Sequence, residues 1–299
     1  MMILIKFLMI IIVLVNIAML TLFERKILGY MQNRKGPNKV LYLGLLQPFS
    51  DFFKLFFKTG FFLKKINKLM YYMAPIISFL LMMMYWMLIS YNKYLLNQEI
   101  NYMMIYIMVI SSFSVYVIMF SGWSSNSKYA LLGSLRGIVQ VISYEVSFSF
   151  LVMILFVYVF SLSFKDIINL QKYMYNMFTF YVLFMFWFII LMVELNRTPF
   201  DFSESESELV SGFNVEYGSL GFMILYMCEY GNILFMSWLS SMLFFNKNIL
   251  LMMLITSLMM IFRGTFVRYR YDIIMNILWK NILPFVMMFF LLYMMYSIF

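Results

Sequence analysis

The sequence predicts an all-α polytopic membrane protein, a single membrane domain over residues 1–299, with about eight transmembrane helices and one amphipathic surface helix. Two observations lead to this prediction. Hydrophobic residues make up 65% of the 299 residues and charged residues only 12%, whereas a soluble domain is about half apolar and a quarter charged. The apolar residues also form long, nearly charge-free stretches, each close to the ~20 residues that a helix needs to cross a bilayer.

Eight such stretches follow one another along the chain and leave no room for a soluble domain. They cover residues 3–23, 71–91, 101–121, 138–160, 174–194, 217–240, 248–266 and 280–298. The longest interruption, residues 24–70, is itself rich in Phe and Leu. It therefore stays close to the membrane.

A surface helix is predicted inside this interruption, at residues 46–58. Asp51, Lys54 and Lys58 lie on one side of this helix. The other side carries five aromatic rings, those of Phe49, Phe52, Phe53, Phe56 and Phe57. This pattern is typical of an amphipathic helix that lies in the membrane surface. A short core helix under a loop is the alternative.

The basic residues predict the orientation of the chain. The loops after the first, third, fifth and seventh spans carry 17 of the 22 Lys and Arg residues. The positive-inside rule places these loops on the matrix or cytoplasmic side. The net charge of +9 is therefore a topology signal. Nucleic-acid binding is not expected, because the cations are scattered over membrane loops without a stacking platform.

The composition also limits the chemistry of the chain. It has no His and one Cys, Cys228, whereas iron–sulfur clusters usually need four Cys and zinc sites draw on Cys and His. It contains no GxGxxG motif and no phosphate-binding loop. We therefore expect no metal or redox cofactor bound by this chain. The 33 Met residues are interpreted as apolar filler.

The choice of residues points to an organellar gene. Ala occurs three times only, whereas Met, Ile, Phe, Lys, Asn and Tyr are abundant. This bias fits an AT-rich genome in which ATA also encodes Met. The apolar N-terminus enters the first predicted span without an Arg- and Ser-rich presequence. Synthesis inside the organelle is therefore expected.

Acidic residues gather in one segment against the basic trend. Residues 194–216 contain six acids and one cation, Arg197. The acids are Glu194, Asp201, Glu204, Glu206, Glu208 and Glu216. Glu145 and Glu229 lie within predicted spans, where a carboxylate costs on the order of 3 kcal/mol and usually has a function. A solvated loop is the alternative for the segment, and a structural hydrogen-bond partner is the alternative for each isolated acid.

Carboxylates in a low dielectric, with water between them, can pass protons near neutral pH. The cations beside the Phe-rich helix suit a long apolar substrate with a polar head. The spacing of these residues fits a quinone, another lipid or a hydrophobic solute equally well.

Several sequence blocks resemble one family. ERKILGYMQNRKGPN at 24–38 resembles the first matrix loop of the membrane subunit numbered one in mitochondrially encoded NADH:ubiquinone oxidoreductase (respiratory complex I). Further matching blocks follow in the family's order over nearly the whole chain. They are GLLQPFSD at 44–51, SGWSSNSKYALLGSLR at 121–136, QVISYEVS at 140–147, ELNRTPFDFSESESELVSGFNVEY at 194–217, and RYRYD and LWKNILP near the C-terminus.

The resemblance implies a core subunit of the proton-translocating NADH:ubiquinone reductase in the mitochondrial inner membrane, with the loops after the odd-numbered spans in the matrix. It implies a quinone access tunnel whose charged lining comprises Glu24, Arg25, Arg34, Asp51, Arg197 and Arg263. It implies a proton path that comprises Glu145, Glu194, Asp201, Glu204, Glu206, Glu208, Glu216 and Glu229. Ubiquinone is then the substrate, and partner subunits hold the flavin and the iron–sulfur clusters. The expected partners are the other membrane-arm and peripheral-arm subunits and phospholipid.

The chain departs from the family pattern at three positions. Thr59 stands where the family often has an acid, Val267 where a proline is common, and Cys228 where a small residue is usual. The first departure weakens any expectation of charge at that point of the surface helix. A stand-alone proton-driven transporter and a membrane scaffold are the rival classes. The sequence shows no internal repeat typical of the first, and the second would lack clustered acids.

Overall fold

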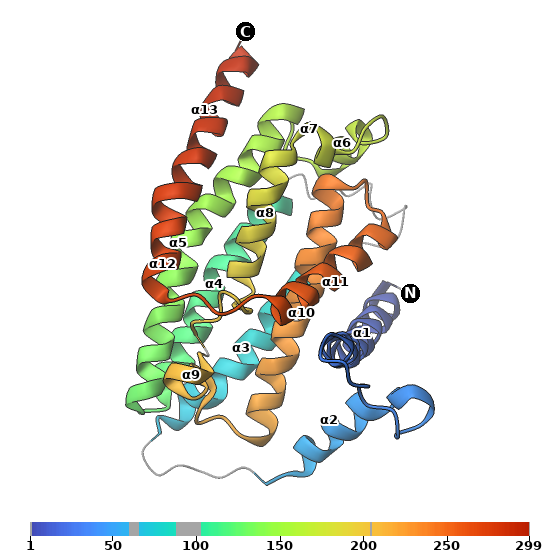
Figure 1. Ribbon diagram of the computed structural model, residues 1–299, viewed down its shortest axis with the longest axis vertical. Coiled ribbons are helices and arrows are strands. Elements are labelled where there is room, and N and C mark those ends of the chain that lie inside the picture. The colour runs from blue at the N-terminus through green and yellow to red at the C-terminus, as the bar shows by residue number, and fades with distance from the viewer. Residues whose placement is uncertain (1, 60–65, 88–102, 204, 299) are drawn as a thin grey trace.

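The computed structural model describes residues 2–59, 66–87, 103–203 and 205–298, and these form a bundle of helices without strands (Figure 1). The principal helices are α1 (Met2–Met31), α3 (Lys68–Met87), α4 (Met103–Ser124), α5 (Lys128–Val159), α8 (Tyr181–Glu194), α10 (Ser219–Phe244), α11 (Ile249–Thr265) and α13 (Leu283–Ile298). The shorter ones are η1 (Tyr42–Gly44), α2 (Gln47–Phe57), α6 (Phe164–Leu170), α7 (Asn176–Thr179), α9 (Glu206–Leu209), η2 (Gly212–Asn214), α12 (Tyr271–Asn276) and the π-helical turn η3 (Ile277–Ile282).

The prediction of an all-α polytopic membrane protein is confirmed. Six helices in the described part of the chain are long and apolar enough to span a membrane, and α12, η3 and α13 together form the last of them. Two shorter apolar helices, α8 and α11, occupy the fifth and seventh predicted spans. Residues 88–91 of the second predicted span and 101–102 of the third lie outside the described residues.

The helices differ from the prediction in four places. The last membrane-length helix begins at Tyr271, in α12, instead of at residue 280. The first helix runs on to Met31 instead of ending near 23, and α5 begins at Lys128 instead of 138. Both helices continue past charged residues because most of these side chains, those of Glu24, Arg25, Lys128 and Arg136, are exposed or form ion pairs. The apolar stretch itself ends at the first charge. The predicted span 174–194 is divided between α7 and α8 at Phe180, whose φ of −120° and ψ of 45° are not helical.

Two long helices form the centre of the bundle. α5 packs against α4, α8 and α13, and α10 packs against α3 and α11. Large rings fill the space between them, with Trp187 of α8 5.3 Å from Phe148 of α5 and 5.8 Å from Phe244 of α10, measured between ring centroids. All three rings are buried. This packing fixes the distances between the helices that carry charged residues.

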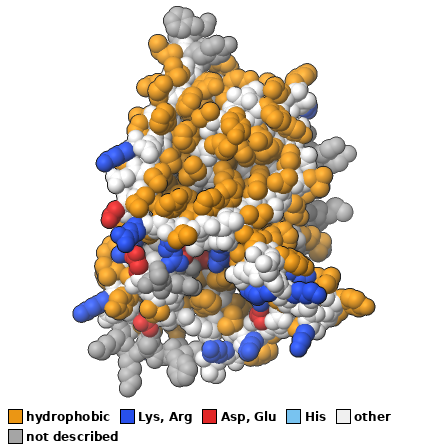
Figure 2. All heavy atoms as spheres, in the orientation of Figure 1, with side chains coloured by type: hydrophobic (Ala, Val, Ile, Leu, Met, Phe, Trp, Pro, Cys, Tyr) orange, Lys and Arg blue, Asp and Glu red, His pale blue; other side chains and the backbone are white. Residues whose placement is uncertain are grey.

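Charged side chains gather at one end of the bundle, and hydrophobic side chains cover most of the rest of the face shown in Figure 2. We call this end the charged end and define it by residues 24–59, 125–136, 195–203, 205–218 and 263–272. It contains α2, which packs on α1 and α10 (Figure 1). The predicted surface helix is therefore present. Its Phe53, Phe56 and Phe57 rings are exposed.

Candidate functional site: two cavities beside one ion pair

A large cavity lies between α1, α2 and α10. Its volume of about 640 Å³ is in the range of sites that bind small molecules. Most of its wall is apolar, and Tyr226 and Tyr230 of α10 contribute aromatic rings. The apolar lining includes Ile11, Leu14, Ile17, Phe49, Phe52 and Phe222. Such walls suit a hydrophobic molecule of some length.

The rim of this cavity is charged. Glu24, Arg25 and Asp51 line it, and Nη1 of Arg25 lies 2.7 Å from Oδ2 of Asp51. Gln47 donates a hydrogen bond to the other carboxylate oxygen of Asp51 at 3.0 Å. Glu24 is buried and forms an ion pair with Arg263 of α11. Four of the six residues predicted for the quinone lining therefore meet at this rim, three directly and Arg263 through Glu24.

Arg34 lies beside a different hollow, which it shares with Arg25 and Lys35. The chain after α1 folds back on the helix here, and a Cβ on Gly36 would come within 3.2 Å of the Cα of Lys26. This close approach directs Arg34 away from the large cavity. Its Nε donates to the side-chain oxygen of Gln32 at 2.8 Å.

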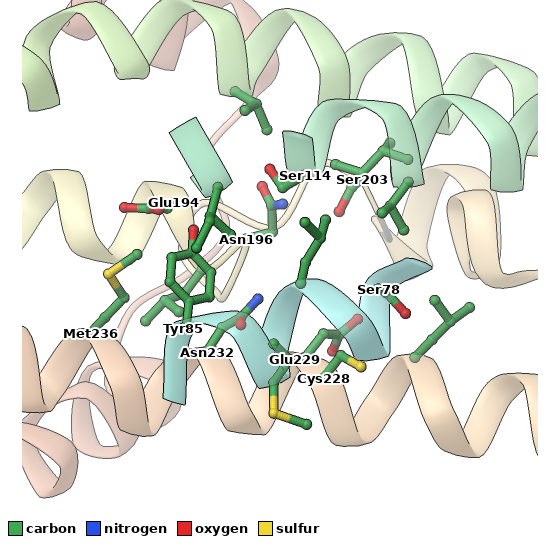
Figure 3. A pocket seen from close by; sticks show the side chains of 18 of the residues that line it. Ser78, Tyr85, Ser114, Glu194, Asn196, Ser203, Cys228, Glu229, Asn232 and Met236 are labelled. Atoms are coloured by element: carbon green, nitrogen blue, oxygen red, sulfur yellow. The ribbon is translucent and has the colours of Figure 1, made fainter. Parts of the chain in front are cut away.

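A smaller cavity of about 120 Å³ lies between α3, α4, α5, α8 and α10. Figure 3 shows Glu194, from α8, and Glu229, from α10, at different parts of its wall, with Tyr85 and Asn232 between them in this view. Buried oxygens of Glu194, Asn196 and Asn232 have no hydrogen-bond partner among the described residues. The cavity is large enough for several water molecules, and its polar wall can bind them.

One ion pair lies between the two cavities. Nη2 of Arg197 lies 3.2 Å from Oε2 of Glu229, and the Arg197 side chain is 8% exposed. The guanidinium carbon also lies 4.7 Å from the ring centroid of Tyr230 and 5.7 Å from that of Tyr226. The two rings line the large cavity and Glu229 lines the small one. Arg197 therefore contacts the wall of both.

A second arginine lies close to this junction. Arg197 and Arg263 line a hollow of about 10 Å³ together with Met192, Met259 and Met260. Arg263 in turn is paired with Glu24 at the rim of the large cavity. Ionic groups thus follow one another from Glu24 through Arg263 and Arg197 to Glu229. Because buried charges are weakly screened, a change of charge at the rim alters the electrostatic potential at the other groups of this line.

The remaining predicted acids occupy different environments. Asp201 is buried, with Oδ2 3.4 Å from Nη2 of Arg268, and the exposed Glu208 pairs with Arg136 of α5. Glu145 is half-buried and interacts electrostatically with Glu194. Glu216 lies apart from both cavities, beside Tyr71. Glu204 and the side chain of Glu206 lie outside the described residues.

Arg197 is the only cation in the acidic segment by sequence, but other elements supply further cations. Arg136 comes from α5 and Arg268 from the chain before α12, and each reaches an acid of the segment. The ion pair that the structure shows for Arg197 is with Glu229 in α10. Anchoring of the segment is therefore shared among several arginines.

Small residues and one amide hold the acidic segment against α5. A Cβ on Gly133 would lie 2.8 Å from the Cα of Gly212, so the two backbones touch. The Gln140 side chain donates to the carbonyls of Val193 and Phe200, at 3.0 Å each. Gln140 is thus a positioning residue that sequence reasoning missed, although an amide inside a predicted span was a usable signal.

Two tyrosines fasten the far end of the segment to α3. The rings of Tyr71 and Tyr217 stack at 4.3 Å, the Tyr71 hydroxyl donates to the carbonyl of Glu216 at 2.7 Å, and the Tyr217 hydroxyl donates to the carbonyl of Tyr71 at 3.1 Å. Burial raises the pKa of Tyr217 to about 12. Its hydroxyl therefore remains a donor at physiological pH.

Sequence reasoning also missed Tyr85 and Tyr144, which are buried in the wall of the small cavity. The chain contains 23 Tyr residues, so a single tyrosine in a span carries no signal of its own. Among the described residues, no group of three or more His, Cys, Asp or Glu side chains is arranged to hold a metal ion.

The fold and the site define a polytopic membrane protein with an apolar cavity, a charged rim and intramembrane acids. The family model described as NADH dehydrogenase matches residues 5–294. The chain is 45% identical over 283 residues to "NADH-ubiquinone oxidoreductase chain 1" of Aedes aegypti, with 93% of this chain and 90% of the relative covered.

Two further relatives carry the same name. The protein from Rhipicephalus sanguineus is 47% identical over 287 residues, covering 93% of this chain and 89% of the relative. That from Artemia franciscana is 43% identical over 288 residues, covering 96% of each. The chain therefore belongs to the family of NADH-ubiquinone oxidoreductase chain 1, which confirms the resemblance noted in the sequence.

Proposed function

We propose that this chain, as a subunit of NADH:ubiquinone oxidoreductase, forms the quinone access tunnel and part of the acidic path that couples quinone reduction to proton translocation. The observation that supports this proposal best is the Arg197–Glu229 ion pair between an apolar cavity and a polar one. Such a pair can transmit a change of charge from the first cavity to the second.

The large cavity suits ubiquinone. Its apolar walls, with the rings of α2, suit an isoprenoid tail, and the charged rim with Arg25 and Asp51 suits a polar head. Arg34 would act from the neighbouring hollow, where a head group enters or leaves. Because the chain has no His and a single Cys, it lacks the ligands of an iron–sulfur cluster. We place the clusters, and the flavin that supplies them with electrons, on partner subunits.

Quinone reduction takes up two electrons and two protons. A quinone that has received electrons but not yet protons is anionic, and it attracts the guanidinium groups of Arg263 and Arg197. That attraction weakens the pair between Arg197 and Glu229. Glu229 then takes a proton from water at the charged end, separately from the two protons that the quinone binds. The proton passes to Glu194 through water in the small cavity and on toward Glu145.

The remaining predicted acids would connect this path to the charged end. Asp201 and Glu208 hold arginines there, and Glu204, Glu206 and Glu216 extend the acidic segment. We place the chain in the mitochondrial inner membrane as one membrane domain with the charged end on the matrix side, as the positive-inside rule requires. Its partners are the other membrane-arm and peripheral-arm subunits, with phospholipid around them.

The test is Glu229→Gln in the assembled complex. The amide keeps the shape of the side chain and much of its hydrogen bonding but cannot release a proton. We expect the complex to assemble and its coupled quinone reductase activity to fall by about tenfold or more, the range typical of a lost proton-transfer group. Asp166→Asn, which changes an acid on α6 that lines neither cavity, is the control and should leave activity unchanged. Normal pumping by Glu229→Gln would show that Glu229 is structural.

A further inference from the structure

The last membrane span carries an exposed polar stripe. Asp272, Asn276 and Lys280 follow one another at intervals of four residues along α12 and η3, and all three side chains are exposed. Exposed Trp279 and Asn281 flank them. The opposite side of the same helix is buried and apolar, and consists of Ile274, Leu278, Ile282 and Val286. We call Asp272, Asn276 and Lys280 the α12 polar stripe.

The stripe extends well into the membrane span. Residues 271–295 form one membrane-length apolar helix, which begins at the charged end and whose continuation carries the C-terminus at the other end (Figure 1). Lys280 comes nine residues after Tyr271, which places it roughly 13 Å along the helix at 1.5 Å per residue. Lys280 therefore lies inside the membrane-length helix, whereas the predicted span of residues 280–298 placed it at the boundary.

This chain does not supply an ionic partner for the stripe within the described residues. Neither Lys280 nor Asp272 takes part in the ion pairs found there. Charged side chains in membrane spans ordinarily face the bundle interior or a hydrated cavity, or are paired. Lys280 faces outward, and it lies within the π-helical turn Ile277–Ile282, a local geometry frequent at functional sites.

We propose that the α12 polar stripe is the docking site of a transmembrane helix of another subunit of the complex, and that this helix carries a carboxylate opposite Lys280. The proposal rests on the membership of the chain in the family of NADH-ubiquinone oxidoreductase chain 1, a subunit of a larger complex. Charge complementarity defines the partner: an acid at the depth of Lys280, an amide or hydroxyl group beside Asn276, and a donor or cation near Asp272. Such polar side chains are the groups that hold helices together in membranes.

An anionic lipid fits this surface less well. A phosphate group stays at the membrane surface, and the stripe presents the carboxylate of Asp272 on that side of Lys280. Exposed Arg270 lies on the same side, ten residues before Lys280, and would bind the phosphate there. Acyl chains, moreover, offer no hydrogen bonds to Asn276 and Asn281 at depth. A helix provides partners of both signs at successive turns.

The contact can be captured in the intact complex. A photoreactive benzoylphenylalanine at position 276 should crosslink to a peptide from a membrane span of another subunit, and that span should contain Asp or Glu. The same residue at Met253, an exposed position of α11, controls for the photochemistry. A phospholipid adduct at 276, a span without an acid, or no adduct at 276 while 253 reacts would each overturn the proposal.

Charge variants give a second, independent measurement. We expect Lys280→Glu to reduce the amount of assembled complex by about tenfold, as expected for loss of polar contacts between helices, whereas Lys280→Arg should assemble normally. Changing the partner acid to Lys in the Lys280→Glu background should restore assembly. Failure of this charge swap, or normal assembly of Lys280→Glu alone, would overturn the proposal.

The two proposals fail in different ways. Complex that does assemble with Lys280→Glu should keep its quinone reductase activity per complex, because Lys280 lines neither cavity. Glu229→Gln should do the reverse and assemble without coupled activity. A docking failure therefore appears in the yield, and a failure of the proposed function appears in turnover.

Discussion

The two halves of α10 differ in almost every respect. The first half, Ser219–Asn232, faces both cavities and carries Glu229 with two tyrosines. From Ile233 to Phe245 every residue is buried, and one of them, Met236, still lines the small cavity. The hydroxyls of Ser237, Ser240 and Ser241 bond to carbonyls three residues earlier in the same helix and leave no polar group free. We call Ser219–Asn232 the permeable half, because it lines both cavities, and Ile233–Phe244 the sealed half, because all of its residues are buried.

The sealed half is closed at its end by α6 and α7. Gln171 donates to the carbonyls of Met242 and Leu243, at 3.2 and 2.5 Å, and Asn176 donates to that of Leu243 at 3.0 Å. The side-chain oxygen of Gln171 accepts a hydrogen bond from the backbone N–H of Asn246. Carbonyls that a helix end leaves unpaired are satisfied here without water. Movement of protons or quinone is therefore expected in the first half only.

Arg197→Met tests the permeable half and should have the largest effect. Removing one partner of a buried ion pair typically costs about 3–5 kcal/mol, so coupled quinone reductase activity per assembled complex should fall by tenfold or more. Arg197→Lys keeps the charge but loses the planar group above Tyr230, a contact worth about 0.5–2 kcal/mol. We expect it to retain intermediate activity.

Steady-state quinone reductase and proton-pumping assays on purified complex separate these outcomes. Full activity in Arg197→Lys would mean that the planar contact with the Tyr230 ring contributes nothing. Full activity in Arg197→Met would show that the ion pair takes no part in coupling. The two halves of α10 would then not differ in function.

Gln171→Leu tests the sealed half. It leaves buried polar groups of the α10 terminus without partners, at a cost of about 1–3 kcal/mol. We expect a lower midpoint of thermal inactivation and unchanged turnover of the intact complex at moderate temperature. Asn169→Ala, an exposed position on the same short helix, is the matched control. Reduced turnover together with unchanged thermal stability would indicate that this half also takes part in coupling.

The permeable half was partly predictable from sequence and the sealed half was not. Glu229 stands out because a carboxylate within an apolar run is rare. Gln171 lies in a predicted loop and Asn176 near the start of a predicted span, where polar residues are ordinary. Their partners at the end of α10 and just beyond it are 67 to 75 residues away. Nothing local in the sequence predicts such pairings.

The same limit applies to the ends of helices. The eight spans follow from apolar stretches, because the bilayer imposes a length and a polarity on each. The continuation of α1 past Glu24 depends on Arg263, which is 239 residues away. The start of α5 depends on small residues, such as Gly133, that touch η2. Tertiary contacts set these boundaries, and hydropathy does not report them.

Asp51→Asn examines the entrance to the permeable half, where a smaller effect is expected. The Arg25–Asp51 pair is 43% and 36% exposed, so solvent screening limits its contribution to less than about 1 kcal/mol. The KM for a short-tail quinone should therefore rise by roughly two- to fivefold, with normal assembly. Ser50→Ala, exposed and adjacent on α2, should change neither KM nor turnover. Unchanged quinone kinetics in Asp51→Asn would show that this carboxylate does not contribute to quinone binding.

Asp166→Asn, next to the sealed half, should have the smallest effect, confined to stability. Ser163 caps α6: its hydroxyl donates to Oδ2 of Asp166 at 2.5 Å and accepts from the Asp166 backbone N–H at 3.3 Å. Hydrogen bonds from Ser163 and Ser161, with the nearby Lys165 cation, hold the pKa of the Asp166 carboxyl below its usual range.

Because the folded state favours the ionised form of Asp166, its stabilising effect is present above the ordinary aspartate pKa and is lost as the pH falls through the lowered value. The thermal midpoint of Asp166→Asn should therefore lie slightly below that of the unchanged protein at neutral pH, and the difference should shrink as the pH falls from about 5 to below 4. Melting curves of the complex over this range measure it. Coupled activity at neutral pH should be the same in both proteins. If activity fell with Asp166→Asn, an acid beside the sealed half would take part in coupling. This result would contradict the division of α10 into a functional and a structural half.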